Sequence, residues 1–285
     1  MLNIPVVLFL YKKLAFVEVI LSEVCESNPS KVYIIMDCPE DSSVKLRQDE
    51  IKEIISNFNS AIPFQVVHPG THLGIRTIIQ FGLGKVFETE EKVIVLEDDT
   101  IPTSLFFQYC KKMLIQFENN STIGCVNGSN LGIKAGKEHY YKSKVSLPFW
   151  GWATWKNRWQ RFPRNYDFWM QFRAQESNCG IVEESTLAIF DRFVEKDKSW
   201  DVKWAMYLFA NSLETVFPGE NLISNVGYTK EATYTNVSNS KFSDLAAEES
   251  IFEEGDFEKE IKLENEYMLK MNELIQEMAR RNTEL

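Results

Sequence analysis

The sequence lacks the glycine patterns of the common nucleotide-binding folds. No G-x-G-x-x-G follows its first predicted strand and no G-x-x-x-x-G-K occurs, so neither a dinucleotide-binding fold nor a P-loop is supported. It also lacks a basic stripe, and a formal net charge of -10 argues against a protein that binds nucleic acid non-specifically. That charge still allows one nucleotide to bind through a metal.

Cysteines and long apolar segments are scarce as well. The five cysteines are odd in number and scattered, without a C-x-x-C, which favours reduced structural thiols in a cytosolic protein. The apolar run at 4–10 is too short to span a bilayer and too close to the terminus for a signal peptide. We therefore expect a cytoplasmic protein without a transmembrane segment, and leave peripheral membrane association open.

Hydrophobic patterning predicts alternating strands and helices in the first half. Strands are predicted at 4–10, 32–36, 64–67, 93–96 and 122–126, and helices at 14–26, 43–58, 75–87 and 104–117. The strand starts lie 28, 32, 29 and 29 residues apart, which is the length of successive βα units. We therefore predict an α/β fold with a parallel sheet and right-handed crossovers.

Three acids follow the strand at 93–96 directly: Glu97, Asp98 and Asp99. Ligands in open α/β sheets bind beyond the carboxyl ends of strands, so these acids are expected at the mouth of a site. Adjacent carboxylates repel one another unless a cation compensates, and a hard divalent metal that also binds phosphate oxygens would supply it. The alternative is a solvated acidic turn.

The other strand ends also carry polar residues. The first strand leads into Tyr11, the second into Asp37, and the third leads through a turn to Arg76. Because these ends share one edge of the predicted sheet, the side chains could converge on one ligand. Asp37 suits a base or ribose, and Arg76, near a helix start, suits a diphosphate. Each residue taken alone is better explained as a turn residue or a surface charge, and the shared edge is what favours a site.

In this order the motifs resemble those of GT-A-fold glycosyltransferases. The likeness is closest to bacterial family-2-like enzymes and to the eukaryotic N-acetylglucosaminyltransferase I family, and it covers roughly residues 4–236. The motifs are P-V-V-L-F-L-Y, I-I-M-D, H-L-G-I-R-x-x-I-x-x-G-L-G-K-V-F and V-I-V-L-E-D-D. A block specific to the bacterial group comprises F-W-G-W-A-T-W-K-N-R-W, S-W-D-V-K-W and P-G-E-N-L-I-S-N-V-G-Y.

The resemblance implies a nucleotide-sugar-binding half (1–127), an acceptor-binding half (128–240), and an acidic linker with a C-terminal helix (241–285). It implies that Asp99 holds Mn²⁺ or Mg²⁺ bridging a nucleotide diphosphate, that Glu97 and Asp98 lie near the ribose or donor sugar, and that Asp37 contacts the nucleobase. The donor-binding residues it implies are Leu8, Tyr11, Asp37, Arg76, Glu97, Asp98, Trp150, Gly151 and Trp152.

All seven tryptophans lie within residues 150–204. Aromatic faces pack against the apolar C–H faces of sugar rings, so the cluster suits carbohydrate, although a buried core is the alternative. Trp155 and Trp159, four residues apart, are predicted to pack. Trp150 and Trp152, which flank Gly151, are predicted to lie in a substrate loop.

Asp201, in W-D-V-K-W, is the predicted catalytic base. Inverting glycosyl transfer needs a carboxylate to remove the acceptor hydroxyl proton. W-D-x-x-W resembles the catalytic W-D of the N-acetylglucosaminyltransferase family. An ordinary helix-start aspartate is the alternative reading, because a negative charge is favourable there; Asp197 is the fallback base.

A departure from the family concerns the metal. Bacterial relatives have a histidine where this chain has Tyr234, and a phenol with a pKa near ~10 is a poor ligand at neutral pH. None of His68, His72 and His139 lies in that segment. We therefore predict that Asp99 is the only firm protein ligand.

Residues 257–281 are predicted to form one long helix. Its apolar stripe consists of Ile261, Met268, Met271, Ile275 and Met278, and the interruption at Glu264 disfavours a coiled coil. We expect this stripe to pack on the body of the same subunit, so that no oligomer is required.

Together these features predict an inverting, metal-dependent glycosyltransferase that moves a sugar from a nucleotide sugar, expected to be a UDP-sugar, to a glycan, polysaccharide or lipid-linked saccharide. A bacterial surface polysaccharide is the expected product. One alternative is a sugar-nucleotide nucleotidyltransferase, which would need a glycine-rich basic loop where this chain has Tyr11-Lys12-Lys13-Leu14. The other is an inactive carbohydrate-binding protein of the same fold.

Overall fold

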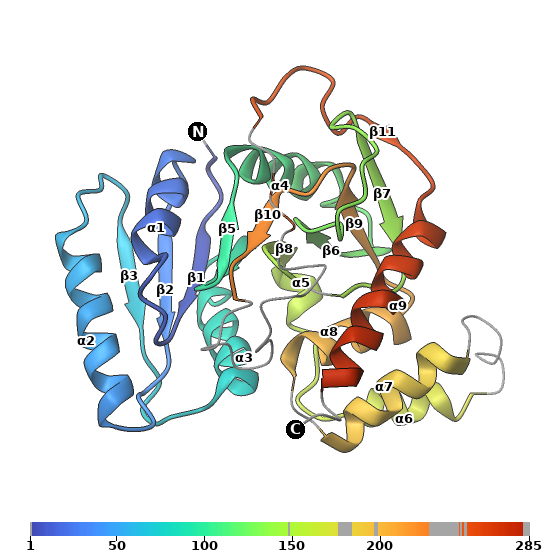
Figure 1. Cartoon of the computed structure of the whole chain (residues 1–285), viewed down its shortest axis with the longest axis horizontal. Helices are drawn as coiled ribbons and strands as arrows, with labels where there is room; N and C mark the ends of the chain where they lie inside the picture. Colours follow the sequence, from blue (N-terminus) through green and yellow to red (C-terminus); the bar gives the residue numbers. More distant parts are fainter. Residues whose placement is uncertain are drawn as a thin grey trace.

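A mostly parallel sheet forms the centre of the molecule. The computed structural model describes residues 2–147, 149–175, 184–196, 199–227, 245, 247 and 250–281. Within them, nine strands form one sheet in the order β11-β7-β9-β6-β8-β4-β1-β2-β3, and β5 and β10 form a separate two-stranded ribbon (Figure 1). The strands are β1 (Val6–Leu10), β2 (Val32–Met36), β3 (Phe64–Val67), β4 (Lys92–Glu97), β5 (Thr100–Pro102), β6 (Ile123–Asn127), β7 (His139–Ser143), β8 (Trp152–Trp155), β9 (Glu214–Pro218), β10 (Ile223–Asn225) and β11 (Lys259–Glu260).

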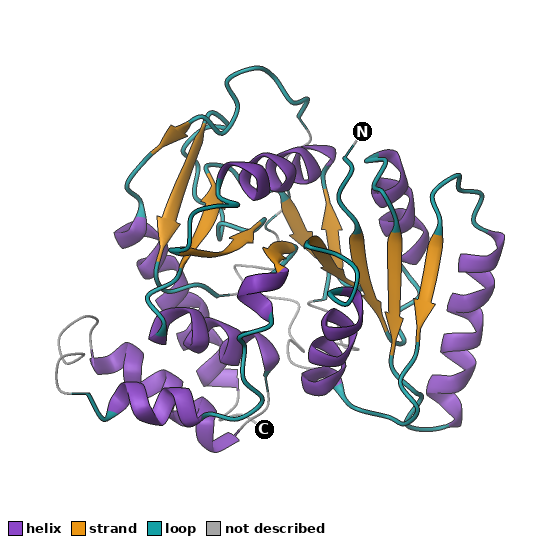
Figure 2. Cartoon of the chain, turned by 180° about the vertical axis from the view of Figure 1, so that it is seen from behind, coloured by secondary structure: helices purple, strands orange, loops and turns teal. Residues whose placement is uncertain are grey.

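Helices lie on both sides of the sheet (Figure 2). The described helices are α1 (Val17–Glu26), α2 (Ser42–Asn57), α3 (Ile75–Val86), α4 (Ser104–Gln116), α5 (Lys156–Trp159), α6 (Asp167–Arg173), α7 (Glu184–Lys196), α8 (Trp200–Ala210) and α9 (Glu264–Arg281). Within these residues, no helix combines the length and apolar composition that crossing a membrane requires. The predicted fold class, α/β with a mostly parallel central sheet and a C-terminal helix, is confirmed.

The sheet is buried on both faces, which explains the continuous apolar runs of its first strands. All five residues of β1 are buried, and they alternate between two cores. Val6 and Leu8 face the core that contains α1, α2 and α4, whereas Val7 and Phe9 face the core that contains α3 and α8. The sheet thus separates two hydrophobic layers and leaves its carboxyl edge for polar residues.

The first four predicted βα units are confirmed. The fifth predicted strand, β6, does not pair with any of the first four strands and has β8 and β9 as its neighbours. β1, β2, β3 and β4 are parallel neighbours. β8 lies between β4 and β6 and runs antiparallel to both. Spacing along the chain predicts parallel βα units but cannot show that a later segment inserts between two of them.

The C-terminal helix begins later than predicted. Residues 257–281 do not form one helix: β11 comes first, and α9 begins at Glu264. Gly255 and Phe257 have positive φ values of 102° and 56°, which a helix cannot contain. Phe257 is buried, and its ring packs against Tyr109 with centroids 4.8 Å apart.

The prediction that the C-terminal helix packs on the body of the protein is confirmed. Its buried residues are Tyr267, Met271 and Leu274, and Met268 is partly buried beside them. The side chains of Ile275 and Met278 lie outside the described residues. Figure 1 shows α9, in red, crossing beside β7 and β9. The predicted stripe therefore misses Tyr267, whose ring lies 4.3 Å from that of Phe217.

The Tyr267 hydroxyl generates a stability prediction. Its Oη donates to the Leu147 carbonyl at 2.7 Å and accepts from the Leu147 N–H at 3.1 Å. Tyr267→Phe should lower the free energy of unfolding by about 1–3 kcal/mol, because it leaves two buried backbone groups unpaired. Urea denaturation measures the loss. Leu269→Ala, on the exposed side of the same helix, is the control and should cost less than about 0.5 kcal/mol. Equal losses would contradict this role of the hydroxyl.

Candidate functional site

The acidic turn lies where β4 ends. Glu97 is the last residue of β4 and pairs with Phe9 of the parallel strand β1. It therefore lies at the edge of the sheet where β1 and β4 have their carboxyl ends. Thr100 closes the turn: its hydroxyl donates to the Glu97 carbonyl, and the Glu97 N–H donates to its Oγ1, both at 2.9 Å. Asp98 and Asp99 occupy the turn itself. The predicted position of these three acids at the sheet edge is therefore confirmed.

Lys13, in the loop after β1, compensates part of this charge. Its Nζ lies 2.5 Å from Asp99 Oδ2 and 3.6 Å from Asp98 Oδ1. The Tyr11 N–H also donates to Asp98 Oδ2 at 3.3 Å. Burial lowers the pKa of Lys13, but Asp99 and Asp98 outweigh this and raise it above its usual value. The sequence analysis did not single out Lys13; a lysine just after the first strand was the available signal.

One ammonium is not enough for the carboxylates gathered here. Burial, followed by the charges of Asp99 and Asp201, raises the pKa of Glu97 well above its usual value. Burial also raises the pKa of Asp98 to about 6; Lys13 opposes this shift and Asp99 adds to it. Burial is the main cause of both shifts, and the neighbouring carboxylates add to it.

Asp201 reaches this cluster from the opposite half of the chain. It lies in the first turn of α8 and is close enough to Glu97 for the two charges to interact. The Ser199 hydroxyl and the Val202 N–H both donate to its Oδ1. Burial raises the pKa of Asp201, while these hydrogen bonds oppose the shift. The fallback base Asp197 lies outside the described residues.

A late segment packs against Asp99. β10 pairs with β5, and the Val226 N–H donates to the Asp99 carbonyl at 2.8 Å. The neighbouring Gly227 N–H donates to Asn225 Oδ1 at 2.8 Å. A Cβ at Gly227 would lie 2.4 Å from Asp99 Oδ2, so only glycine fits there without moving the carboxylate. P-G-E-N-L-I-S-N-V-G-Y was the sequence signal, but it does not reveal this contact. Tyr234 lies outside the described residues.

Asp37 is fixed by the chain after β3. It is 4% exposed, and its carboxylate accepts from the N–H groups of Leu73 (2.9 and 3.1 Å) and Gly74 (2.7 Å). Gly74 has φ +73°, a conformation that favours glycine and points its N–H at the carboxylate. His72 Nδ1 lies 3.1 Å from Asp37 Oδ2. These bonds account for the burial of Asp37 without a nucleobase, so its contact with one stays a prediction.

The other predicted donor residues differ in accessibility. Arg76 is exposed in the first turn of α3, and Tyr11 is half-buried beside His72. Burial, with the charge of Glu40, raises the pKa of Tyr11 to about 12, so its hydroxyl keeps its proton. Leu8, in contrast, is fully buried in β1. The Leu8 side chain is therefore not accessible to a ligand. It packs in the hydrophobic core beneath the sheet edge.

The tryptophans form mainly a core. Trp155 and Trp159 are buried, as predicted. The prediction that Trp152 lies in a substrate loop is wrong, because it begins β8, is 1% exposed, and stacks on Trp200 with centroids 5.4 Å apart. Trp150 is half-buried between the two cores.

Gly151 lies between Trp150 and β8, where its backbone passes close to Gly128 and Ile223. Its φ is +61°, and its carbonyl accepts from the Gly128 N–H at 2.7 Å. An added Cβ would lie 2.4 Å from Ile223 Cδ1. Gly151 therefore has a packing role against β10, and its predicted contact with the donor remains a prediction.

The acidic turn suits a divalent cation. Carboxylates outnumber the one ammonium, and hard cations prefer carboxylate oxygens. Within the described residues, no group of three or more His, Cys, Asp or Glu side chains is arranged to hold a metal. Of Asp98, Asp99 and Lys13, Asp99 has the most exposed side chain, and its role as the metal ligand stays a prediction.

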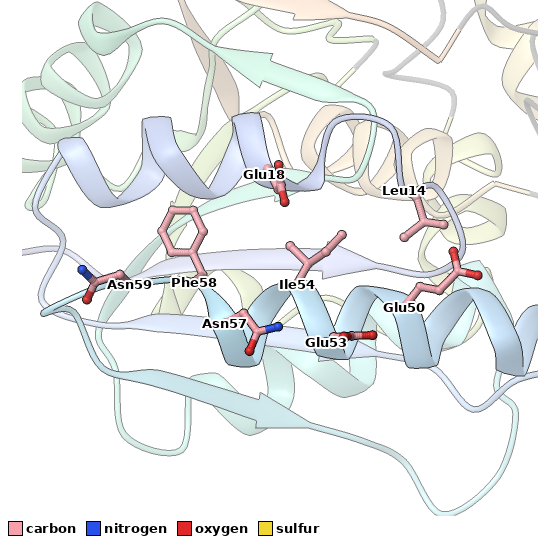
Figure 3. Close-up of a pocket in the computed structure, with 8 residues that line it drawn as sticks. All are labelled: Leu14, Glu18, Glu50, Glu53, Ile54, Asn57, Phe58 and Asn59. Atoms are coloured by element: carbon pink, nitrogen blue, oxygen red, sulfur yellow. The ribbon is translucent and has the colours of Figure 1, made fainter.

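A pocket of about 460 Å³ lies elsewhere, between α1 and α2 (Figure 3). Three glutamates line it, Glu18, Glu50 and Glu53, so its charge disfavours a phosphate-containing ligand. None of the predicted site residues lines this pocket.

No protein-family model and no curated protein sequence matches the chain. Among solved structures, it is similar to UDP-glucose pyrophosphorylase complexed with UDP-glucose (11% identity over 77% of this chain and 91% of that chain, TM-score 0.40). It is also similar to S. aureus TarS 1-349 (10% identity, 78% and 59%, TM-score 0.44) and to 4-diphosphocytidyl-2C-methyl-D-erythritol synthase from Anaerococcus prevotii (11% identity, 74% and 99%, TM-score 0.33). At these TM-scores the likenesses assign neither a family nor a reaction, and kinship with the N-acetylglucosaminyltransferase I family stays a prediction.

The raised pKa of Asp98 generates a prediction for the protein without metal or nucleotide. Between about pH 4 and 6 the folded state keeps a proton that the unfolded state, with a carboxyl pKa near ~3.9, has lost. The free energy of unfolding therefore falls as pH rises through this window. Asp98→Asn removes this penalty, and should raise the free energy of unfolding on the order of 1–3 kcal/mol at pH 7.5 but little at pH 4.

Thermal and urea unfolding at the two pH values measure this difference. Glu53→Gln removes one negative charge at an exposed position of α2 and should show no such pH-dependent gain. A variant Asp98→Asn that is less stable than the parent at pH 7.5 would show that the Lys13 pairing outweighs burial.

Proposed function

We propose that the protein is an inverting, metal-dependent glycosyltransferase of the GT-A fold, which transfers a sugar from a nucleotide-diphosphate sugar to a glycan or polysaccharide. One observation carries the proposal: Asp201, in the first turn of α8, is close enough to Glu97, at the end of β4, for its charge to raise the pKa of Glu97. A candidate base from the second half of the chain is thus within electrostatic range of the acidic edge of the first half.

Asp201 has the surroundings of a general base. The reaction needs a carboxylate to accept the acceptor hydroxyl proton while that oxygen bonds to the anomeric carbon. The bond from that carbon to the donor oxygen breaks, and its electron pair leaves with the nucleotide diphosphate. Burial raises the pKa of Asp201 towards the working pH, which makes it a stronger base than an exposed carboxylate. The bonds from Ser199 and Val202 hold its orientation.

The residues at the other strand ends would bind the donor. A divalent cation, when bound, stabilises the charge of the departing diphosphate. Asp99 would hold it, and Arg76, in the first turn of α3, would contact phosphate where the helix terminus favours an anion. Tyr11, whose hydroxyl stays protonated, would donate a hydrogen bond in the same pocket.

The donor is proposed to be a UDP-sugar, the product a bacterial surface polysaccharide, and the location the cytoplasm. The nucleotidyltransferase alternative has less support, because the loop after β1 contains Tyr11-Lys12-Lys13-Leu14 and no glycine. Product analysis separates the two reactions, since a glycosyltransferase releases a nucleoside diphosphate and a nucleotidyltransferase releases pyrophosphate. A binding protein of the same fold would release neither.

The role of Asp201 is tested by Asp201→Asn. Because the amide cannot accept the proton, turnover of a UDP-sugar should fall by roughly 10²–10⁴-fold, while UDP binding measured by calorimetry stays unchanged. Asp167→Asn is the matched control, since Asp167 is an exposed aspartate in the first turn of α6. Near-native turnover of Asp201→Asn would refute the assignment and move attention to Asp197.

The role of Asp99 is tested by manganese binding. With one firm protein ligand, Mn²⁺ should bind weakly to the free protein and at least about tenfold more tightly with UDP, as expected for coupled ligands. Asp99→Ala should abolish the gain from UDP. Tight binding of Mn²⁺ without UDP would contradict a single ligand, and full turnover in EDTA by both proteins would remove the metal from the reaction.

A further inference from the structure

Lys13 and its neighbour Lys12 face different partners. Lys12 is 42% exposed, and its Nζ lies 3.8 Å from Glu40. Lys13 is 19% exposed, and its Nζ contacts both Asp99 and Asp98. Two lysines in one loop therefore offer a matched pair, of which only Lys13 reaches the acidic turn.

The Lys13 ammonium occupies one of the two oxygens that Asp99 could offer to a metal. It lies 2.5 Å from Asp99 Oδ2, and on the Gly227 side a single added Cβ would lie 2.4 Å from the same oxygen. A divalent cation bound to that oxygen would be about 2.0–2.6 Å from it. Two cations on one carboxylate oxygen would lie within a few ångströms and repel strongly. The ammonium and the metal therefore exclude each other at Asp99 Oδ2.

Once displaced from Asp99, the ammonium keeps Asp98 as a neighbour and gains the diphosphate oxygens when the donor is present. Lysine carries its charge on a flexible four-carbon stem, so Nζ can move while the backbone stays. The loop backbone is held separately, because the Tyr11 N–H donates to Asp98. Metal alone would leave Lys13 facing a compensated aspartate, whereas metal with a nucleotide diphosphate brings new anionic oxygens to the same edge.

We propose that Lys13 is a built-in counter-ion that competes with the divalent metal for Asp99 and moves to the donor diphosphate when both bind. This inference rests on the proposed function for the identity of the donor. It makes Lys13 a positioning residue that couples metal binding to nucleotide binding, because the nucleotide removes the competitor from the metal ligand.

The test measures Mn²⁺ affinity of the full chain by electron paramagnetic resonance, with and without UDP. Lys13→Met keeps an apolar stem but removes the charge, so it should bind Mn²⁺ alone at least about tenfold more tightly than the parent. The gain in Mn²⁺ affinity from added UDP should shrink by a similar factor. Lys12→Met should match the parent in both measurements, which separates the ion pair from a general loss of positive charge.

Unchanged or weaker Mn²⁺ binding by Lys13→Met, including no binding by any of the proteins, would overturn the proposal. If Lys13 has a purely structural role, Lys13→Met should lower the melting temperature without increasing Mn²⁺ affinity. That outcome would also overturn the proposal. Should Lys13→Met fail to fold, Lys13→Gln replaces it, because its amide can still donate to the aspartates. Tighter Mn²⁺ binding without turnover of any UDP-sugar would uphold the counter-ion and reject the proposed reaction.

Discussion

The ion pair between Lys13 and the acidic turn joins the end of β1 to the end of β4. It compensates part of a charge that the fold itself creates, because parallel neighbours place their carboxyl ends together. Burial, together with the neighbouring carboxylates, raises the pKa values of Glu97 and Asp98 despite this pairing. Buried carboxylates at such an edge are stabilised by positive charge.

An aromatic core sets the distance between this edge and the proposed base. Trp152, on β8, stacks on Trp200, and Trp159 packs against Trp204 with centroids 4.9 Å apart. Trp200 and Trp204 belong to α8, whose first turn carries Asp201. The tryptophans therefore act mainly through packing: they fix α8, which carries Asp201, against β8, the strand that neighbours β4.

Much of the first half was predictable from sequence. The bounds of β2 and β3 agree with the prediction, and the acids after β4 lie at the predicted edge, because buried parallel strands have continuous apolar runs that end abruptly. The side-chain roles were less predictable. A buried tryptophan and a loop tryptophan look alike in W-G-W-A-T-W, so Trp152 was misplaced, and nothing local to Lys13 indicates its partner 86 residues away.

The sequence by itself determined the βα alternation, the fold class and the acidic strand end, since each depends on local hydrophobic periodicity and residues adjacent in the chain. Only the tertiary structure decided that β8 inserts antiparallel between β4 and β6, that the turn around Gly227 packs on Asp99, and that the charge of Asp201 acts on Glu97. These interactions join segments that are not adjacent in the chain, from β6 and β8 to the more distant Asp99 and Gly227. They arise from the packing of whole elements, whose free energy depends on complementary surfaces and not on any local pattern of residues.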